Sequence, residues 1–188
     1  FDVIKEERML LFSRASSTGM HRFSGIWTGD NRSWWSHLLL NIKMMPSLNM
    51  CGYLYSGADI GGFSDNTTED LLTRWLQFGI FTPLMRNHTA KYTRAQEPYR
   101  FKSMAVMRHF ICLRYVLVNH LYSEYMKACL SNTLYFKALA FEYSDDISKE
   151  IEDQLLLGDG LMIAPIYEQN KTGRVVYFPE EMLCVRFT

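Results

Sequence analysis

Residues Phe23-Ser24-Gly25-Ile26-Trp27-Thr28-Gly29-Asp30 form a short apolar run that passes directly into a polar loop ending on a carboxylate. A run of this length, closed by a glycine-bearing loop, is typical of a buried strand. Residues 34–48 then carry apolar side chains every three or four positions, which is the spacing of a helix. The same order returns in residues 51–59, whose first five residues resemble a strand, and in residues 71–81, which have helical spacing. Ser33 is expected to cap the first helix, and Thr68 with Glu69 to begin the second. The chain therefore alternates strand and helix.

Repeated strand-helix units predict a parallel sheet with right-handed crossovers. A further apolar run at residues 9–12 precedes Arg14, so three predicted strands are each followed by a charged residue. The carboxyl ends of parallel strands meet at one edge of the sheet, where such folds bind their ligands. We therefore expect Arg14, Asp30 and Asp59 to lie at that edge.

The middle of the chain continues the α/β pattern. Residues 97–125 have the spacing of a long helix, with Pro98 in its first turn, and residues 134–141 resemble a further strand. A closed barrel of eight strand-helix units needs about 250 residues. The chain therefore supplies roughly half of a TIM-type barrel.

The pattern changes near Gly158. Residues 161–166 and 174–178 are strand-like runs joined by a polar stretch at residues 168–173, which is a hairpin signal. We therefore predict two parts, a partial (β/α)8 catalytic barrel over residues 1–157 and the start of a small β domain over residues 158–188.

The composition excludes several classes of function. Lys plus Arg number 20 and Asp plus Glu number 20, so the formal net charge is zero. This balance argues against nucleic acid as a partner and against a polybasic membrane anchor. The most apolar stretch, residues 110–125, is interrupted by charged and polar residues, so no membrane-spanning segment is expected either.

The four cysteines form no Cys-x-x-Cys pair and have no matching histidine spacing. Neither a metal site nor a disulfide framework is therefore expected. This cysteine usage suits a reducing compartment, and we expect the cytoplasm. The sequence begins at Phe1 without a signal-peptide pattern and ends within an apparent hairpin, so we expect a chain truncated at both ends.

A group of chemically active residues recurs at successive loop positions. It combines a cation, carboxylates, aromatic surfaces and an imidazole. Aromatic faces can stack on the apolar face of a sugar ring while charged groups hydrogen-bond its hydroxyls, so the mixture suits a polyhydroxylated ligand. The candidate residues are Arg14, Trp27, Asp30, Asp59, Phe63 and His88.

Several ordered motifs resemble one known family. They are Arg14-Ala15-Ser16, Trp27-Thr28-Gly29-Asp30-Asn31, Gly57-Ala58-Asp59-Ile60-Gly61-Gly62-Phe63, Arg74-Trp75-Leu76-Gln77 and Arg86-Asn87-His88. Together they closely resemble glycoside hydrolase family 31, the α-glucosidase family. The resemblance implies the C-terminal half of a TIM-type barrel, followed by the opening strands of a proximal C-terminal β domain.

The resemblance also implies roles for individual residues. Asp30 matches the family's catalytic acid/base. The family's nucleophilic aspartate belongs to an earlier barrel strand, upstream of Phe1, so we expect this chain to be inactive alone. No cofactor or metal is implied. The positions around the sugar ring at the cleaved end of the substrate match Arg14, Trp27, Asp59, Phe63 and His88.

The implied activity is retaining hydrolysis that releases glucose from the non-reducing end of α-glucosides. In this chemistry one carboxylate attacks the anomeric carbon, while the other protonates the departing oxygen and then activates water. Asp30 is the expected proton donor. The expected partners are an α-glucoside oligosaccharide and the missing N-terminal half of the same enzyme.

Other interpretations stay open. Another family 31 activity, such as α-xylosidase, transglycosidase or α-glucan lyase, would use the same residues, because substrate choice depends on pocket walls that lie partly upstream. A noncatalytic carbohydrate-binding fragment is a third hypothesis, because one catalytic carboxylate is missing. Arg14 could be a structural ion-pair partner of Asp59, and His88 could be a hydrogen-bonded structural histidine.

Overall fold

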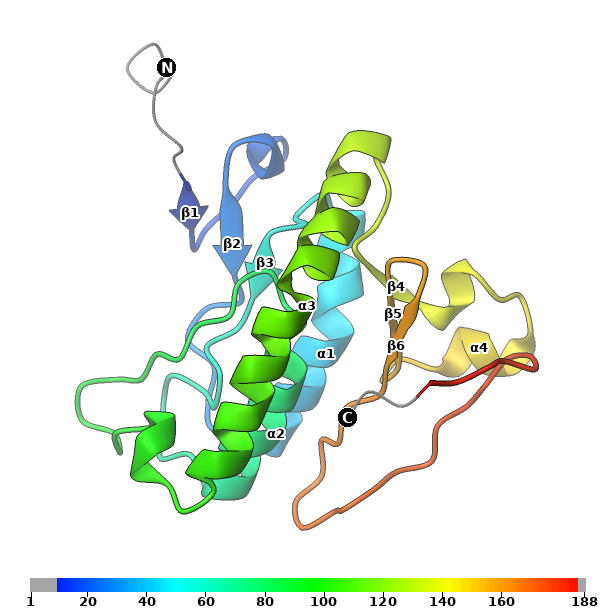
Figure 1. The fold of residues 1–188 in the computed structure, drawn as a ribbon. Helices are drawn as coiled ribbons and strands as arrows, with labels where there is room; N and C mark the ends of the chain where they lie inside the picture. The colour runs from blue at the N-terminus through cyan, green and yellow to red at the C-terminus, as the bar shows by residue number, and fades with distance from the viewer. Residues whose placement is uncertain (1–9, 186–188) are drawn as a thin grey trace.

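The computed structural model describes residues 10–185. Its first elements form a parallel sheet of three short strands. The strands are β1 (Phe12–Ser13), β2 (Gly25–Trp27) and β3 (Ser56–Gly57), in that order across the sheet (Figure 1). The 3-10 turn η2 (Met20–Arg22) lies between β1 and β2. Both strand pairings are parallel, which confirms the predicted arrangement.

The third strand begins later than the sequence predicts. The predicted strand covers residues 51–55, whereas β3 starts at Ser56. The helix before it extends to Met50, and the chain then turns at Gly52, whose φ is +86°. The amide of Tyr53 still donates to a carbonyl of that helix, at 2.9 Å. The residues just after Met50 thus form the turn that ends this helix and do not belong to a strand.

The first long helix, α1 (Trp35–Met50), follows β2. Its N-cap is Trp34 and no side chain caps it, so the prediction that Ser33 caps this helix is wrong. The hydroxyl of Ser33 donates instead to the carbonyl of Ser64, at 3.0 Å. This bond ties the loop after β2 to the loop after β3.

The next helix, α2 (Glu69–Gly79), begins where the sequence predicts, because the hydroxyl of Thr68 accepts the amide of Leu71 at 3.2 Å. The long helix α3 (Met104–Ser131) starts later than predicted, since Pro98–Arg100 form a separate 3-10 turn, η3. Neither α3 nor another helix within the described residues is both long and apolar enough to cross a bilayer.

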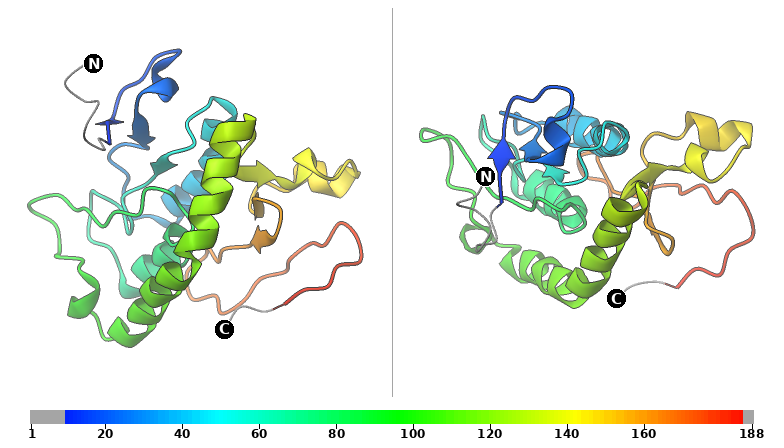
Figure 2. Two further views of the ribbon diagram at one scale, coloured as in Figure 1. Left: turned by 45° about the horizontal axis from the view of Figure 1, so that its top comes forward. Right: turned by 90° about the horizontal axis from the view of Figure 1, so that it is seen from above.

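The core lies among the three long helices and extends to the second sheet described below. Leu38 and Ile42 of α1, Leu72 and Trp75 of α2, and Met107 of α3 are each at most 1% exposed. Burial of such side chains contributes about 1.5–3 kcal/mol each. Figures 1 and 2 show the helices separating the parallel strands from a second sheet. Packing against the helices thus fixes the orientation of the parallel sheet, and with it the edge at which its strands end.

The second sheet is antiparallel and follows α3. Its strands are β4 (Phe136–Ala138), β5 (Leu155–Leu157) and β6 (Leu161–Ile163), paired in that order. The 3-10 turn η4 (Leu139–Phe141) and the short helix α4 (Asp146–Glu150) connect β4 to β5. The predicted strand over residues 134–141 is therefore confirmed only in its centre.

The hairpin lies earlier in the chain than predicted. β5 and β6 are joined by a turn that begins at Gly158, whose φ is +55°. Residues 174–178, the predicted second arm, form no strand. Tyr177 pairs instead with the side-chain amide of Gln154, donating to it at 2.8 Å and accepting from it at 3.0 Å. The predicted domain boundary after residue 157 falls within the observed hairpin and stays a prediction.

Candidate active site

The loops after the three parallel strands place charged side chains at one edge of the sheet. Arg14 follows β1, Asp30 follows β2 and Asp59 follows β3. Nη2 of Arg14 lies 3.7 Å from Oδ2 of Asp30, and the two side chains are 64% and 45% exposed. The ion pair between Arg14 and Asp59, an alternative that the sequence leaves open, is not the one that forms.

Asp59 is held by Arg86. The Asp59 side chain has no exposed surface, and its Oδ1 lies 2.7 Å from Nε and 2.5 Å from Nη2 of Arg86. A parallel backbone bridge places the two residues side by side. Burial raises the pKa of Asp59 above its ordinary value, an effect that Arg86 and His88 oppose. Oδ2 is buried without a partner among the described residues. It is therefore an unsatisfied acceptor, which a ligand hydroxyl reaches only when the side chains that cover it move aside.

An aromatic pair lies against the same arginine. Trp27 stacks on Phe12, with ring centroids 5.1 Å apart and planes 24° apart. The guanidinium carbon of Arg86 lies 5.2 Å from the centre of the Trp27 ring and 5.5 Å from that of Phe12. The indole nitrogen of Trp27 is buried and makes no hydrogen bond within residues 10–185. Arg86 thus joins the Asp59 carboxylate to an aromatic wall with a free donor.

A second aromatic contact completes the group. His88 stacks on Phe63, with ring centroids 5.0 Å apart and planes 28° apart. The amide of Ala90 donates to the carbonyl of Phe63 at 2.9 Å, which ties their loops together. Besides burial and Arg86, the charge of His88 lowers the pKa of Asp59 and the charge of Asp30 raises it. The contacts thus join Arg14 to Asp30, Trp27 to Asp59 through Arg86, and Phe63 to His88. The roles of these six residues stay a prediction.

Buried amides behind Asp30 support the loop that carries it. Asn31 donates to the hydroxyl of Thr28 at 3.2 Å and accepts from the amide of Asn41 at 3.2 Å. Asn41 also accepts the Thr28 hydroxyl at 2.7 Å and donates to the carbonyl of His37 at 2.8 Å. The residues on both sides of Asp30 are thus fastened to α1.

The loops after β2 and β3 touch directly at Gly62. The carbonyl of Asn31 accepts the amides of Phe63 and Ser64, each at 2.8 Å. Gly62 has a φ of +90°, and a Cβ there would lie 2.5 Å from the amide nitrogen of Ser33. A glycine is therefore required where the two loops meet.

Two residues that hold the group together are missed by the predictions from sequence. Arg86 stands in the Arg86-Asn87-His88 motif, from which only His88 is assigned to the site. Its place in that motif, two residues before His88, is the signal that could have found it. Gln96 lies in a polar loop with no pattern that marks it. Only the fold brings its side chain against the loops of Asp59 and His88.

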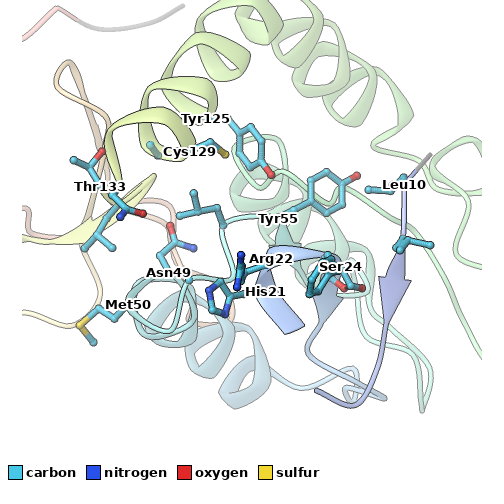
Figure 3. Close-up of a pocket in the computed structure, with 18 residues that line it drawn as sticks. Leu10, His21, Arg22, Ser24, Asn49, Met50, Tyr55, Tyr125, Cys129 and Thr133 are labelled. Carbon is cyan, nitrogen blue, oxygen red and sulfur yellow. The ribbon is translucent and has the colours of Figure 1, made fainter. Parts of the chain in front are cut away.

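A cavity of about 570 Å³ opens at the opposite ends of the strands (Figure 3). Its walls include Leu10, Ser24 and Tyr55, which precede the strands or lie next to their starts, and Asn49 and Cys129 from the last turns of α1 and α3. None of the six predicted site residues lines it. The cavity is therefore distinct from the edge that carries Asp30 and Asp59.

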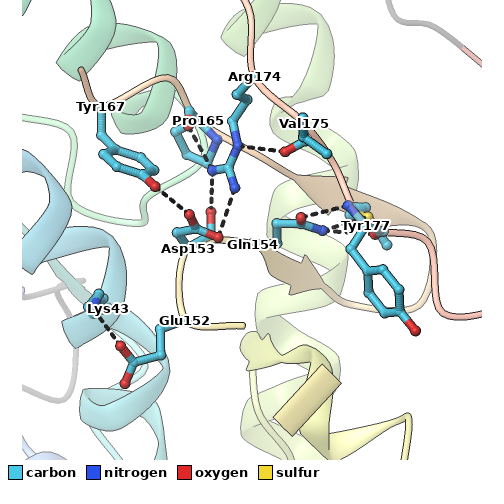
Figure 4. Close-up of polar contacts among 10 residues, drawn as sticks. Lys43, Glu152, Asp153, Gln154, Pro165, Tyr167, Arg174, Val175 and Tyr177 are labelled. Atoms are coloured by element: carbon cyan, nitrogen blue, oxygen red, sulfur yellow. Dashed lines mark hydrogen bonds and ion pairs between the residues drawn. The ribbon is translucent and has the colours of Figure 1, made fainter. Parts of the chain in front are cut away.

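The segment after β6 is fastened by a half-buried arginine, Arg174 (Figure 4). Arg174 donates to the carbonyls of Asp153 and Pro165, at 2.9 and 3.1 Å, and its Nη2 lies 2.8 Å from Oδ1 of Asp153. The hydroxyl of Tyr167 donates to Oδ2 of Asp153 at 2.6 Å. Although burial acts in the opposite direction, these bonds hold the pKa of Asp153 below its ordinary value.

The same segment reaches the first turns of α2. The amide of Asn170 donates to Asp70 at 3.0 Å, and Arg74 donates to the carbonyl of Lys171 at 2.8 Å. Since α2 follows β3, its first turns lie at the edge of the sheet that carries the candidate site. In the part of the chain that the structure describes, no group of three His, Cys, Asp or Glu side chains is placed to hold a metal ion.

These features define a class of protein. Parallel strand-helix units with charged and aromatic side chains at the strand ends, followed by an antiparallel sheet, are parts of a (β/α)8-barrel catalytic domain joined to a small β domain. Residues 2–124 match the TIM-barrel domain of glycosyl hydrolases family 31, and residues 132–188 match the C-terminal domain of that family. The chain belongs to glycoside hydrolase family 31, as the motifs predict.

Individual relatives agree with this assignment. Alpha-glucosidase 2 of Bacillus thermoamyloliquefaciens is 40% identical over 181 residues, which cover 95% of this chain and 23% of the relative. Lysosomal alpha-glucosidase of Rattus norvegicus is 40% identical over 178 residues, which cover 93% and 19%. The glucosidase II alpha subunit, in its alpha3-Glc2-bound crystal structure, has a TM-score of 0.87 at 34% identity, covering 92% and 19%. The chain thus spans about a fifth of the length of these relatives.

Proposed function

We propose that the protein containing this chain releases glucose from the non-reducing end of α-glucosides by retaining hydrolysis. Asp30 protonates the departing oxygen and then takes a proton from the attacking water, while the nucleophilic carboxylate comes from outside residues 1–188. The observation that carries the proposal is the placement of Asp30 at the edge of the sheet that also carries Asp59 and His88, in a member of family 31.

The other side chains are proposed to bind the sugar ring. Once the side chains that cover them move aside, the unpartnered Oδ2 of Asp59 accepts a hydrogen bond from one sugar hydroxyl, and the indole N–H of Trp27 donates one to another. Phe63 and His88 together offer a stacked, amphipathic wall for the apolar face of the ring. Glucosidase II structures with bound oligosaccharides, alpha3-Glc2 and Glc1Man2, support a glucoside as the partner.

Replacing Asp30 by Asn in the complete protein tests the acid/base role. On maltose, whose leaving group needs protonation, we expect kcat to fall about 10²- to 10⁴-fold. On p-nitrophenyl α-glucoside kcat/KM should fall much less, because p-nitrophenolate departs without a proton. Its kcat should still fall, because the second step has lost its base. Full turnover of Asp30→Asn on both substrates would refute the role. Hydrolysis of an α-glucoside by purified residues 1–188 alone would refute the division of roles between Asp30 and an outside nucleophile.

Asp65 provides a matched control for this experiment. Its Oδ2 lies 3.7 Å from Nη1 of Arg32, and it is 43% exposed, much like Asp30 beside Arg14. Asp65 also lies on a neighbouring loop, with a φ of 72° that asparagine tolerates well. We therefore expect Asp65→Asn to keep kcat on both substrates within about twofold.

Two measurements separate the proposal from its alternatives. Rates of the complete protein on p-nitrophenyl α-glucoside and α-xyloside distinguish glucosidase from xylosidase activity. An Asp on the strand that precedes this segment would support an enzyme, and its absence would favour a noncatalytic carbohydrate-binding protein.

We propose the cytoplasm as the compartment of the protein. Support comes from four cysteines that are all unpaired and exposed: Cys51, Cys112, Cys129 and Cys184. Labelling with a thiol reagent in lysates made without reductant tests this, since all four should react, whereas protection of any pair would contradict it.

A further inference from the structure

We propose that Gln96 is a positioning residue whose side-chain amide holds the loop of Asp59 and the loop of His88 at a fixed separation. This inference rests on the proposed function, because the two loops carry residues assigned there to the sugar ring. Gln96 itself touches no substrate in this scheme. It acts through the backbone of the loops that do.

The contacts of Gln96 converge on three carbonyls. Nε2 donates to the carbonyls of Ile60 at 3.1 Å, Gly62 at 3.0 Å and His88 at 3.3 Å, and the residue is 1% exposed. Among the described hydrogen bonds, none of these carbonyls accepts from another group. A primary amide carries two N–H groups on one nitrogen, so it can serve acceptors on both loops at once.

Two glycines make this convergence possible. Gly61 and Gly62 have φ of +87° and +90°, a region that other residues rarely adopt. They turn the chain sharply after Asp59. A Cβ on Gly61 would lie 2.7 Å from Cδ1 of Leu72 and 3.5 Å from Nε2 of Gln96, so the turn is packed directly against the amide. The backbone of the Asp59 loop is thus shaped to meet Gln96.

The backbone of Gln96 is also bonded to the loop of His88. The side chain of Asn87, the neighbour of His88, donates to the backbone carbonyl of Gln96 at 2.8 Å. Oε1 of Gln96 is buried without a partner among the described residues. Rotating the amide would set this oxygen against three carbonyl oxygens, so the donor orientation is the favourable one. Gln96 is therefore a spacer: its side chain holds the two loops at a fixed distance, with its N–H groups facing their carbonyls.

Removing the Gln96 side-chain amide should impair catalysis more than it impairs the folding of the rest of the chain. The three carbonyls would keep no protein donor, and the loops could move apart to reach water. Displacement of a positioning group by about 1 Å can cost about 10²-fold in rate. The effect should reach both ligand binding and turnover, because Asp59, Phe63 and His88 lie on these two loops.

The test compares Gln96→Leu and Gln96→Glu with wild type in the complete protein. For Gln96→Leu we expect kcat/KM on maltose to fall about 10- to 100-fold. The inhibition constant of 1-deoxynojirimycin, a glucose-shaped iminosugar, should rise by a similar factor. Amide hydrogen exchange should accelerate in residues 59–63 and 88–90.

Gln96→Glu adds a pH signature that a merely structural role would not produce. A protonated Glu can still donate one hydrogen bond to the carbonyls, whereas an ionised Glu presents only acceptors to them. The carbonyls therefore raise the pKa of the introduced carboxyl. The kcat/KM of Gln96→Glu relative to wild type should fall as the pH rises through that pKa.

Asn49 provides the matched control. Its buried amide donates to the carbonyl of Tyr53 at 3.1 Å and accepts the amide of Phe136 at 2.7 Å, at the opposite end of the strands. Asn49→Leu should lower the thermal midpoint but keep kcat/KM and the inhibition constant within about twofold.

The outcomes separate this inference from the proposed function. Gln96→Leu with kcat/KM and inhibition constant near those of wild type would overturn the positioning role. If Gln96→Leu does not fold, a pH-independent activity ratio for Gln96→Glu overturns it. If wild type hydrolyses no α-glucoside, the proposed function fails. Faster exchange in both loops of Gln96→Leu, absent in Asn49→Leu, would then still support Gln96 as the spacer.

Discussion

Arg86 places two guanidinium nitrogens on one oxygen of Asp59, at 2.7 and 2.5 Å, although the Asp59 side chain has no exposed surface. Arg14 and Asp30 lie at the same edge of the sheet with a separation of 3.7 Å and ample exposure. Breaking a buried pair leaves an uncompensated charge, whereas an exposed pair contributes little to stability. Substitution of Arg86 should therefore lower the stability of the fold strongly, whereas substitution of Arg14 should hardly change it.

Replacing Arg86 by Leu should lower the free energy of unfolding by about 3–5 kcal/mol at neutral pH. Burial already raises the pKa of Asp59, and removing Arg86 takes away the main opposing effect. A raised folded-state pKa means that stability is retained below the ordinary pKa of aspartate and lost as the pH rises through the folded-state pKa. Denaturant unfolding between pH 4 and 7 should therefore show a loss that grows with pH.

The double variant Arg86→Leu/Asp59→Asn is the control for this prediction. It removes the buried charge along with its partner, so it should recover most of the lost stability and remove the pH dependence. An equal loss at pH 4 and pH 7 in the single variant would contradict the assignment of the penalty to the Asp59 carboxylate.

Replacing Arg14 by Met should change the free energy of unfolding by less than about 1 kcal/mol, because the pair with Asp30 is exposed. In the complete protein, kcat/KM on α-glucosides should nevertheless fall at least about tenfold, the effect of losing one charge-assisted hydrogen bond to the sugar. Denaturant unfolding and steady-state kinetics on the same preparation check both parts. Unchanged kinetics would assign Arg14 a surface role only.

Much of the candidate site could be predicted because its chemistry follows directly on short apolar runs. Arg14, Asp30 and Asp59 each come just after a strand, and parallel strands bring such positions to one edge whatever the details of the loops. Periodicity also located α1 and α2, since their buried faces repeat every three or four residues. Exact strand limits matter little to that inference.

Pairing between distant residues could not be predicted in the same way. Arg86 and Asp59 are 27 positions apart, and two of the Gln96 bonds span 34 and 36 positions. Whether Arg14 or Arg86 reaches Asp59 depends on loop paths that a periodic pattern does not encode. The misplaced hairpin has a similar cause, because Gln154 satisfies the backbone of Tyr177 with a side chain where the sequence predicts a strand.

Replacing Gly62 by Ala should disrupt the contact between the loops after β2 and β3. The new Cβ would adopt a left-handed φ of +90° and would lie 2.5 Å from the Ser33 amide nitrogen, so the loop of Asp30 must shift. We expect a stability loss above the cost of about 1–2 kcal/mol for the backbone conformation alone. Activity of the complete protein should fall with it, because a 1 Å shift of a catalytic group is costly.

Gly19→Ala isolates the steric part of that effect. Gly19 has the same φ of +90°, but a Cβ there would meet nothing within 4 Å. Thermal unfolding should therefore show only the backbone cost for Gly19→Ala, with kinetics unchanged. Equal behaviour of the two variants would mean that the Gly62 contact does not hold the loops together.

Replacing Arg174 by Gln should release the segment that follows β6. The change removes the pair with Asp153 and weakens two bonds to carbonyls, and hydrogen bonds to charged groups contribute about 1.5–3 kcal/mol. Hydrogen exchange in residues 165–178 should therefore accelerate about 10- to 100-fold at neutral pH. Because the pKa of Asp153 is lowered in the fold, the stabilisation is present above its ordinary pKa and is lost as the pH falls through the lowered one.

The difference between wild type and Arg174→Gln should accordingly be full at pH 7 and shrink below about pH 4, once exchange is corrected for its intrinsic pH dependence. Lys149→Ala is the control, since Lys149 forms an exposed pair with Asp146 at 2.8 Å and should leave residues 165–178 unaffected. A difference that stays constant down to pH 3 would show that Arg174 acts through the carbonyls of Asp153 and Pro165 and not through the Asp153 carboxylate.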